Sequence, residues 1–295
     1  MYIQKRNKYS RMIINLFMCV VCIMFILPLV YIISISFTPQ TDIAFYGYRL
    51  IPRNPTLSAY TYVLGNINSI IRAYGVTVFV TVVGTFFSII LTSMLAYVLS
   101  RQDLLIGKYL NLYVLFTMIF NGGIVTTYIW VSQYLNLRDN ILALILPFLV
   151  LPWHLFLMRG FMRDLPVALL ESAKIDGASE LRIFSHIVMP LSKPSLATIG
   201  IFTAFIYWND WWLALLYIDN RNLIPIQLFL YRVQATLAAL THSGGANVDM
   251  SLIIEVPQDA TLMVVCIMAT APMMFIFPFF QKYFIKGMTV GSIKG

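Results

Sequence analysis

Six long apolar stretches constrain this chain more than any other feature of its sequence. They cover residues 12–37, 74–100, 109–134, 141–158, 195–217 and 260–280, and they contain a single carboxylate, Asp210. A helix needs about 20 mainly apolar residues to cross the hydrocarbon layer, so each stretch is long enough, or nearly so, to span a membrane. Charged residues make up 11% of the chain, against about 25% in soluble domains. We therefore predict an all-α, polytopic membrane protein with six transmembrane helices.

The lysines and arginines orient these spans. With the N-terminus inside, the cytoplasmic segments hold 14 of the 20 and the outer segments hold the other 6. Cytoplasmic loops carry the excess of Lys and Arg in membrane proteins, so we expect both termini to be cytoplasmic. The predicted parts are a cytoplasmic N-terminus (1–11), a transmembrane region (12–283) with long outer loops at 38–73 and 218–259, and a cytoplasmic tail (284–295). Anionic lipid accounts for the net charge of +8, so nucleic acid is not an expected partner.

The sequence lacks the motifs of a protein that supplies its own energy or chemistry. It has no G-x-x-x-x-G-K-[ST] phosphate-binding motif, and the single carboxylate within the spans gives little support for proton or sodium coupling. The three histidines have no hydrolase context, and the three cysteines lie within predicted spans without zinc-ligand spacing. We predict no enzymatic activity, no catalytic residue, no metal site and no cofactor bound by this chain.

The segment between the fourth and fifth spans is more polar than its surroundings. Residues 171–194 read ESAKIDGASELRIFSHIVMPLSKP, with five charged residues within a dozen positions. Apolar residues recur at helical spacing on both sides of an Asp-Gly pair, which predicts two short helices joined by a tight turn. The small residues Ala173 and Ala178 beside the turn would permit close approach by another protein. The alternative is an amphipathic hairpin that rests on lipid headgroups.

The same segment resembles the EAA loop of ABC importer permeases, whose pattern is E-A-A-x-x-D-G-A followed by I-x-x-P. Ser172 replaces the second-position alanine, and seven residues match: Glu171, Ala173, Asp176, Gly177, Ala178, Ile187 and Pro190. The resemblance continues along nearly the whole chain, in AYVLSR, FNGGIVTTYIWVSQYLNLRDN, YWNDWW and QKYFIKGMTVGSIKG, to the MalG- or LplC-like carbohydrate-uptake branch. It implies the type I ABC importer permease fold, with the EAA loop at residues 165–190.

The resemblance also implies site residues. In that family the EAA loop docks on a separate ATPase subunit, which binds the ATP and Mg²⁺, and the glutamate of the loop pairs with a basic residue there. The ATPase-coupling residues would be Glu171, Ala173, Asp176, Gly177 and Ala178.

The C-terminal tail would reach between the ATPase subunits. A flexible basic end lying on lipid is the alternative. The tail residues in contact with the ATPase would be Lys286, Gly287, Gly291 and Lys294.

Small and polar residues share one face of the fifth predicted span, at i, i+4, i+7, i+11 and i+14. A carboxylate in hydrocarbon costs at least about 2.5 kcal/mol, so this face should turn away from lipid. It is a candidate lining of a transport pathway, and hydrogen bonding between helices is the alternative. Besides Ala214, the candidate residues are Thr203, Tyr207, Asp210 and Tyr217.

The function implied is that of the permease subunit of an ATP-driven, binding-protein-dependent sugar or oligosaccharide importer in the bacterial cytoplasmic membrane. Its partners would be a second homologous permease, two ATPase subunits, an extracytoplasmic solute-binding protein docked on the outer loops, an oligosaccharide and membrane lipid. Two other functions stay open: a secondary carrier that needs no ATPase, and a membrane sensor or assembly subunit. The sequence does not indicate which sugar is carried.

Overall fold

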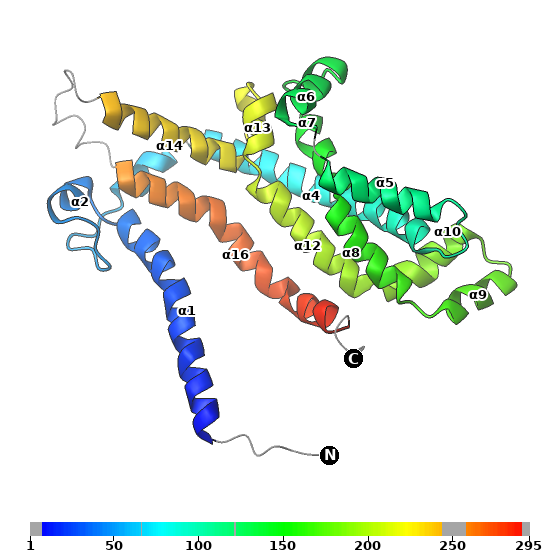
Figure 1. The fold of residues 1–295 in the computed structure, drawn as a ribbon. Helices are drawn as coiled ribbons and strands as arrows, with labels where there is room; N and C mark the ends of the chain where they lie inside the picture. The colour runs from blue at the N-terminus through cyan, green and yellow to red at the C-terminus, as the bar shows by residue number, and fades with distance from the viewer. Residues whose placement is uncertain (1–7, 66, 121, 244–257, 291–295) are drawn as a thin grey trace. The chain divides into compact units, whose positions relative to one another are not determined.

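The structure is a computed structural model that describes residues 8–65, 67–120, 122–243 and 258–290 (Figure 1). Within these ranges the chain forms helices, turns and loops, and no strand. It divides into two compact units, one made of Met1–Ile67 with Arg232–Ala271 and the other of Asn68–Tyr231 with Pro272–Gly295.

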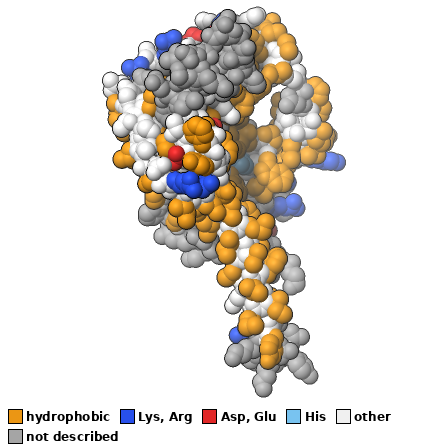
Figure 2. Space-filling view, turned by 90° about the vertical axis from the view of Figure 1, so that its left-hand side faces the viewer, with side chains coloured by type: hydrophobic (Ala, Val, Ile, Leu, Met, Phe, Trp, Pro, Cys, Tyr) orange, Lys and Arg blue, Asp and Glu red, His pale blue; other side chains and the backbone are white. Residues whose placement is uncertain are grey.

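The first unit contains α1, which has the highest mean hydropathy of the three long apolar helices in the described residues. Within Arg11–Ser36, the apolar 18-residue window has a mean hydropathy of 3.0 and contains no buried residue. Burial begins only at the end of the helix, at Ser34, Ile35 and Ser36. Figure 2 shows hydrophobic side chains along the visible face of this helix. An apolar surface of this length without cover from its own chain is typical of a membrane span. The unit comprises α1 (Lys8–Ser36), α2 (Gln40–Tyr46), α3 (Ser58–Leu64), most of α14 (Ile226–Ser243) and the first half of α16 (Gln258–Val290).

The second unit carries the long helix α4 (Ile67–Ser100) and the segments that pack on it. Between its α-helices lie two π-helical turns, η1 (Trp130–Tyr134) and η3 (Phe184–Val188), and two 3₁₀ turns, η2 (Leu146–Phe148) and η4 (Arg221–Leu223). The other helices are α5 (Gly107–Ile119), α6 (Ile124–Ile129), α7 (Leu142–Ile145), α8 (Pro152–Arg163), α9 (Val167–Ile175), α10 (Glu180–Ile183), α11 (Met189–Leu191), α12 (Lys193–Asn209) and α13 (Trp212–Tyr217).

Two buried apolar clusters hold this second unit together. One lies around the first half of α4 and joins it to α7, α12 and α13; its buried members include Val80, Leu144 and Tyr207. The other lies at the C-terminal end of α4 and joins it to α8, α10, η3 and α12; Met158 and Ile183 are fully buried there. The second cluster positions the polar segment at residues 171–194.

Three unbroken helices in the described residues are long and apolar enough to cross a membrane: α1, α4 and α16. Three bent helix pairs meet the same test when each pair is taken as one span. The pair Leu142–Phe148 and Pro152–Arg163 bends by 47°, and the pair Glu180–Leu191 and Lys193–Asn209 bends by 80°. The prediction of six apolar spans therefore agrees with the structure only if three of them are broken.

Three of the six predicted spans, 109–134, 141–158 and 195–217, are broken within their length. The third stretch breaks before Gly123, whose φ of +83° lies in the left-handed region that favours glycine. The fourth breaks before Pro152 because the residue before a proline is disfavoured in the helical region, and Leu151 is extended with ψ of 122°.

The fifth stretch breaks at Asp210, which is extended with ψ of 116°. Its Oδ1 accepts a hydrogen bond from the backbone N–H of Leu213 at 3.4 Å. Aspartate is favoured near helix starts for this reason, and here it lies between the end of α12 and the start of α13 at Trp212. The predicted stripe therefore lies on two helices instead of one.

Candidate functional site

The polar segment forms a hairpin of two short helices, α9 and α10, that continues into η3; we call residues 167–188 the hairpin. Its turn is a Schellman motif. The N–H of Ala178 donates to the carbonyl of Ala173 at 2.9 Å, and the N–H of Gly177 donates to that of Lys174 at 3.0 Å. Gly177 has φ of +76°, where a Cβ would be strained. The predicted turn at Gly177 is confirmed, and its geometry explains why glycine stands there.

The inner side of the hairpin packs on the chain's own core. Ile183 and Val188 are fully buried in the cluster at the end of α4, and Ala173, Ala178 and Phe184 pack against it. The two alanines were predicted to let another protein approach closely. In the structure they let the hairpin approach its own bundle, and their role toward another protein stays a prediction.

The outer side of α9 is open. Glu171 and Asp176 are exposed, and Ile175 is 87% exposed although its side chain is apolar. Glu171 and Ile175 are four residues apart, so they lie on one face of the helix. On α10, Leu181 is 69% exposed. The hairpin therefore presents a carboxylate and apolar side chains that the described part of the chain leaves uncovered.

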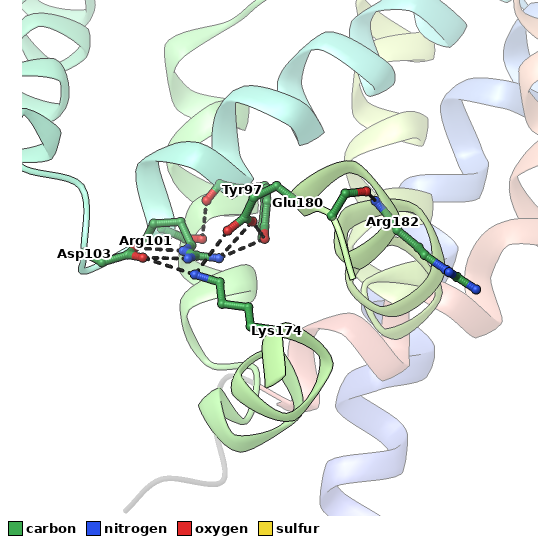
Figure 3. A network of polar contacts seen from close by, with 8 residues as sticks. Tyr97, Arg101, Asp103, Lys174, Glu180 and Arg182 are labelled. Atoms are coloured by element: carbon green, nitrogen blue, oxygen red, sulfur yellow. Dashed lines mark hydrogen bonds and ion pairs between the residues drawn. The ribbon is translucent and has the colours of Figure 1, made fainter. Parts of the chain in front are cut away.

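A network of five polar side chains ties the hairpin to the end of α4 (Figure 3). Glu180 lies at the start of α10, and its Oε2 accepts hydrogen bonds from the hydroxyl of Tyr97 at 2.6 Å and from Nη1 of Arg101 at 3.1 Å. Nη1 of Arg101 also donates to the Tyr97 oxygen at 3.0 Å. We call Tyr97, Arg101, Asp103, Lys174 and Glu180 the brace.

Arg101 and Lys174 close the brace from two sides. Arg101 binds Asp103 through two parallel bonds, Nε to Oδ1 at 2.9 Å and Nη2 to Oδ2 at 2.6 Å. Lys174, on α9, lies 3.4 Å from Oδ2 of Asp103 and 3.1 Å from Oε1 of Glu180. Bidentate arginine–carboxylate pairs are among the stronger hydrogen-bonded pairs in proteins. Both helices of the hairpin are thus linked to the segment that ends α4.

The charges of the brace favour each other's ionised forms. The hydrogen bond from Arg101 holds the pKa of the Asp103 carboxyl well below its usual range. The same bond raises the pKa of the Arg101 guanidinium. The Arg101 side chain is 16% exposed and the Asp103 side chain 62% exposed, so solvent screens the outer part of the brace more than its centre.

A cavity of about 240 Å³ lies beside the brace, between the end of α4, the end of α8 and α9. Its lining carries charges of both signs, from Arg101, Asp103, Arg163, Glu171 and Lys174. Glu171 therefore borders both the open side of the hairpin and this cavity. A charged side chain of a partner could enter it and meet a carboxylate.

The stripe of the fifth stretch is mostly buried within the chain. Thr203 lies 3.1 Å from Nδ1 of His154 on α8, and the hydroxyl of Tyr207 donates to the carbonyl of Ile145 at 2.8 Å. The ring of Tyr217 stacks on Tyr128 with centroids 5.7 Å apart. Ala214 is also fully buried, whereas Asp210, in the break, is partly exposed. The contacts of Thr203 and Tyr207 are those of the alternative interpretation, hydrogen bonding between segments of the bundle.

The C-terminal candidates are only partly within the described chain. Helix α16 continues to Val290, so Lys286 and Gly287 lie in its last turns. Gly291 and Lys294 lie outside the described residues. Among the residues that the structure does describe, no group of three or more His, Cys, Asp or Glu side chains is placed to hold a metal ion.

The brace is the part of this site that sequence reasoning missed. The sequence predicted a charged hairpin but not its partners, because Tyr97, Arg101 and Asp103 lie at the far end of the second span. The one available signal was the group Arg101 and Asp103 directly after an apolar run. An arginine that pairs with a carboxylate at the end of a helix still has N–H donors that can bind a residue of another segment.

The chain resembles known proteins over nearly its full length. Residues 76–290 match the family model described as "Binding-protein-dependent transport system inner membrane component". The chain belongs to this family. It is therefore an inner-membrane component of a binding-protein-dependent transport system, and the matched residues include the brace and the hairpin.

Individual relatives of this family member support the assignment. It is 38% identical to the polygalacturonan/rhamnogalacturonan transport system permease protein YtcP of Bacillus subtilis, over 98% of this chain and 100% of that protein. It is 39% identical to protein LplC of the same organism, over 92% and 90%. The arabinooligosaccharides transport system permease protein AraQ of Halalkalibacterium halodurans is 30% identical, over 92% and 91%.

A solved structure shows the fold. One chain of a bacterial ABC transporter involved in the import of the acidic polysaccharide alginate superposes with a TM-score of 0.80 at 24% identity, over 96% of this chain and 99% of that one. The prediction of an all-α, type I ABC importer permease fold with six transmembrane helices is confirmed.

Proposed function

We propose that this chain is the transmembrane permease subunit of an ATP-driven importer of carbohydrates in the bacterial cytoplasmic membrane. The observation that carries the proposal is the hairpin. It bears the EAA-type sequence and exposes the side chains of Glu171 and Ile175. Its Glu180 is hydrogen-bonded to Tyr97 of the long apolar helix α4. A surface with these three properties is suited to receive a partner and to pass its movement on to the spans.

The relatives support carbohydrate as the substrate class. Two of those named above, YtcP and AraQ, are described as belonging to transport systems for polygalacturonan/rhamnogalacturonan and for arabinooligosaccharides, and the structural neighbour belongs to a transporter involved in the import of alginate. These carbohydrates include acidic and neutral polymers, so they support oligosaccharides in general and leave the particular sugar open.

The partners follow from the family and from what this chain lacks. Membership of a binding-protein-dependent transport family supports a solute-binding protein as a partner, and we propose that it docks on the outer loops 38–73 and 218–259. The absence of a phosphate-binding motif supports a separate source of ATP hydrolysis, and we propose two ATPase subunits that bind the ATP and Mg²⁺ while this chain is non-catalytic. A second, homologous permease completes the pathway. With 14 of 20 basic residues on one side, both termini and the hairpin lie in the cytoplasm.

Within this proposal the hairpin couples ATP binding to transport. Closure of the ATPase subunits on ATP pulls the hairpins of the two permeases together and shifts their spans from inward-open to outward-open. ATP shifts the equilibrium because it binds the closed arrangement more tightly. Glu171 pairs with a basic residue of the ATPase, and Ile175 and Leu181 supply apolar contact. The tail residues Lys286, Gly287, Gly291 and Lys294 contact the ATPase subunits as well.

The break between α12 and α13 is the best-supported position for a pathway residue on this chain. Broken spans and carboxylates at membrane depth both mark substrate sites in transporters. Asp210 has both properties and is partly exposed. Thr203, Tyr207 and Tyr217 would then hold the helices that line the pathway in place.

Uptake in cells tests this function. In a strain that lacks the chain, labelled oligogalacturonides and arabino-oligosaccharides are supplied, and wild type and Glu171→Lys are restored at equal membrane abundance. The proposal predicts that wild type restores uptake of at least one carbohydrate and that Glu171→Lys does not. Uptake that survives Glu171→Lys would favour a secondary carrier. Partner binding by wild type without any flux would favour the sensor or assembly subunit.

A further inference from the structure

The hairpin and the end of α4 are held together in two layers. The polar layer is the brace, centred on Oε2 of Glu180, which accepts from both Tyr97 and Arg101. The apolar layer lies beneath it: the ring of Tyr97 is 5.5 Å from that of Phe184, and Ile183 is fully buried in the same cluster. A movement of the hairpin along α4 would break both layers at once.

Helix α8, which leads into the hairpin, is fixed to the same point. Nε of Arg159 donates to the carbonyl of Leu99 in the last turn of α4 at 2.9 Å. The last carbonyls of a helix have no partner within the helix, and a cation near them is favourable. The end of α4 is thus the place where α8 and the hairpin meet.

We infer that Arg101 and Glu180 are positioning residues that make the hairpin and α4 move as one body. The inference rests on the proposed function, because only a hairpin that is moved by a partner needs such a link. Closure of the ATPase would then displace α4 together with the hairpin, instead of sliding the hairpin over a stationary span. The Lys174–Asp103 contact is longer, at 3.4 Å, and more exposed, so it contributes less.

Spin–spin distances in the assembled complex test the link. Spin labels are placed at Gln102, after α4, and at Ser185, on the hairpin; both positions are exposed. Cys19, Cys22 and Cys266 are first replaced by alanine. Distances are measured without nucleotide and with ATP and vanadate, and ATP hydrolysis is recorded for the same samples.

The wild-type complex should give a narrow distribution of spin–spin distances, with the same mean in both nucleotide states. Glu180→Gln keeps the size of the side chain but removes its charge. It should broaden the distribution of spin–spin distances and make its mean differ between the nucleotide states, with the ATPase still bound and active. Tyr97→Phe, which keeps the ring on Phe184, should give a smaller change of the same kind. Arg182→Gln is the matched control on α10, because its side chain points away from the brace, and it should behave as wild type (Figure 3).

Two results would overturn the inference. One is a wild-type distance that changes with nucleotide, which would show the hairpin sliding on α4. The other is a narrow, unchanged distance in both Glu180→Gln and Tyr97→Phe. Failure of the proposed function would look different, because the ATPase would then be missing from the wild-type complex or would be retained at full strength by Glu171→Lys.

Discussion

The hydroxyl of Tyr97 donates a hydrogen bond of 2.6 Å to Oε2 of Glu180, which joins the last turn of α4 to the first turn of α10. The two residues are separated by 83 positions in the sequence. Because Arg101 donates to the same oxygen, the carboxylate is held by a neutral and a charged donor together. The polar hairpin is therefore bonded to the end of the long apolar helix α4, although the two are far apart in the sequence.

Removal of the Tyr97 hydroxyl should lower the stability of the chain. Hydrogen bonds to charged groups contribute about 1.5–3 kcal/mol, and the partial exposure of the Glu180 carboxylate favours the lower end of that range. Thermal unfolding of the chain in detergent, wild type beside Tyr97→Phe, measures the loss. Tyr113→Phe is the control, since Tyr113 is 67% exposed on α5. Equal melting temperatures for the two variants would contradict the importance of this bond.

A substitution at Gly177 should strain the hairpin turn. With φ of +76°, an alanine there costs about 1–2 kcal/mol because its Cβ approaches the following carbonyl. Hydrogen exchange of the α9 amides in Gly177→Ala should therefore be faster than in wild type. Gly160→Ala provides the comparison, because this glycine lies within α8, has no positive φ and has open space around its Cβ position. The turn assignment is wrong if both variants exchange alike.

Gly84 should tolerate no side chain. A Cβ at this position would lie 2.5 Å from Cζ and 2.7 Å from Cε2 of Tyr207, a buried ring that cannot move away freely. Overpacking of this kind costs about 1–3 kcal/mol, so Gly84→Ala should lower the melting temperature in detergent. Gly75→Ala, on the same helix, meets no atom within 4 Å and should be neutral or stabilising. An unchanged melting temperature in Gly84→Ala would mean that α4 and α12 lie farther apart than in this structure.

Asp139 should make one loop sensitive to acid. Its Oδ1 accepts hydrogen bonds from the backbone N–H groups of Asn220 at 2.6 Å and Asp219 at 2.7 Å, and these donors lower the pKa of the carboxyl. A lowered pKa gives a stabilisation that is present above the ordinary aspartate pKa of about 3.9 and is lost as the pH falls through the lower pKa of the folded state.

Asp139→Asn separates this effect from other titrations. The amide oxygen can still accept both bonds and asparagine tolerates the left-handed φ of 54°, but the side chain does not titrate. The difference in melting temperature between wild type and Asp139→Asn should be constant near neutral pH and shrink below about pH 4. A difference that does not change with pH would show that the carboxylate contributes nothing through its charge.

The sequence predicted the features of this fold that depend on local composition. Apolar runs of the right length located the spans, and the Asp176–Gly177 pair located the hairpin turn, because a left-handed residue is needed at that point whatever surrounds it. The family resemblance supplied the fold class. Each of these depends on residues that are close together in the sequence.

The remaining features depend on contacts between distant residues. Nothing in the spacing of Glu180 indicates that Tyr97 is its partner, and the inner position of Ala173 and Ala178 follows from the cluster at the end of α4. The break at Asp210 was missed because the helical spacing of the stripe remained regular across it. The side chain of Asp210 accepts a hydrogen bond from the N–H of Leu213 in the next helix, and side-chain to backbone bonds of this kind compete with a continuous helix.

The most direct test of the account is whether the ATPase leaves the complex when Glu171 is reversed in charge. The tagged chain is purified from its native membrane as wild type, as Glu171→Lys and as Asp219→Lys. The last is a charge reversal on an exposed residue after α13 that also breaks an exposed ion pair with Arg138. Bound proteins are identified and ATP hydrolysis is assayed. We expect a second permease with all three, and an ATPase with wild type and Asp219→Lys but not with Glu171→Lys. A wild-type chain that purifies alone, or a Glu171→Lys complex that retains its ATPase at full strength, would contradict the account.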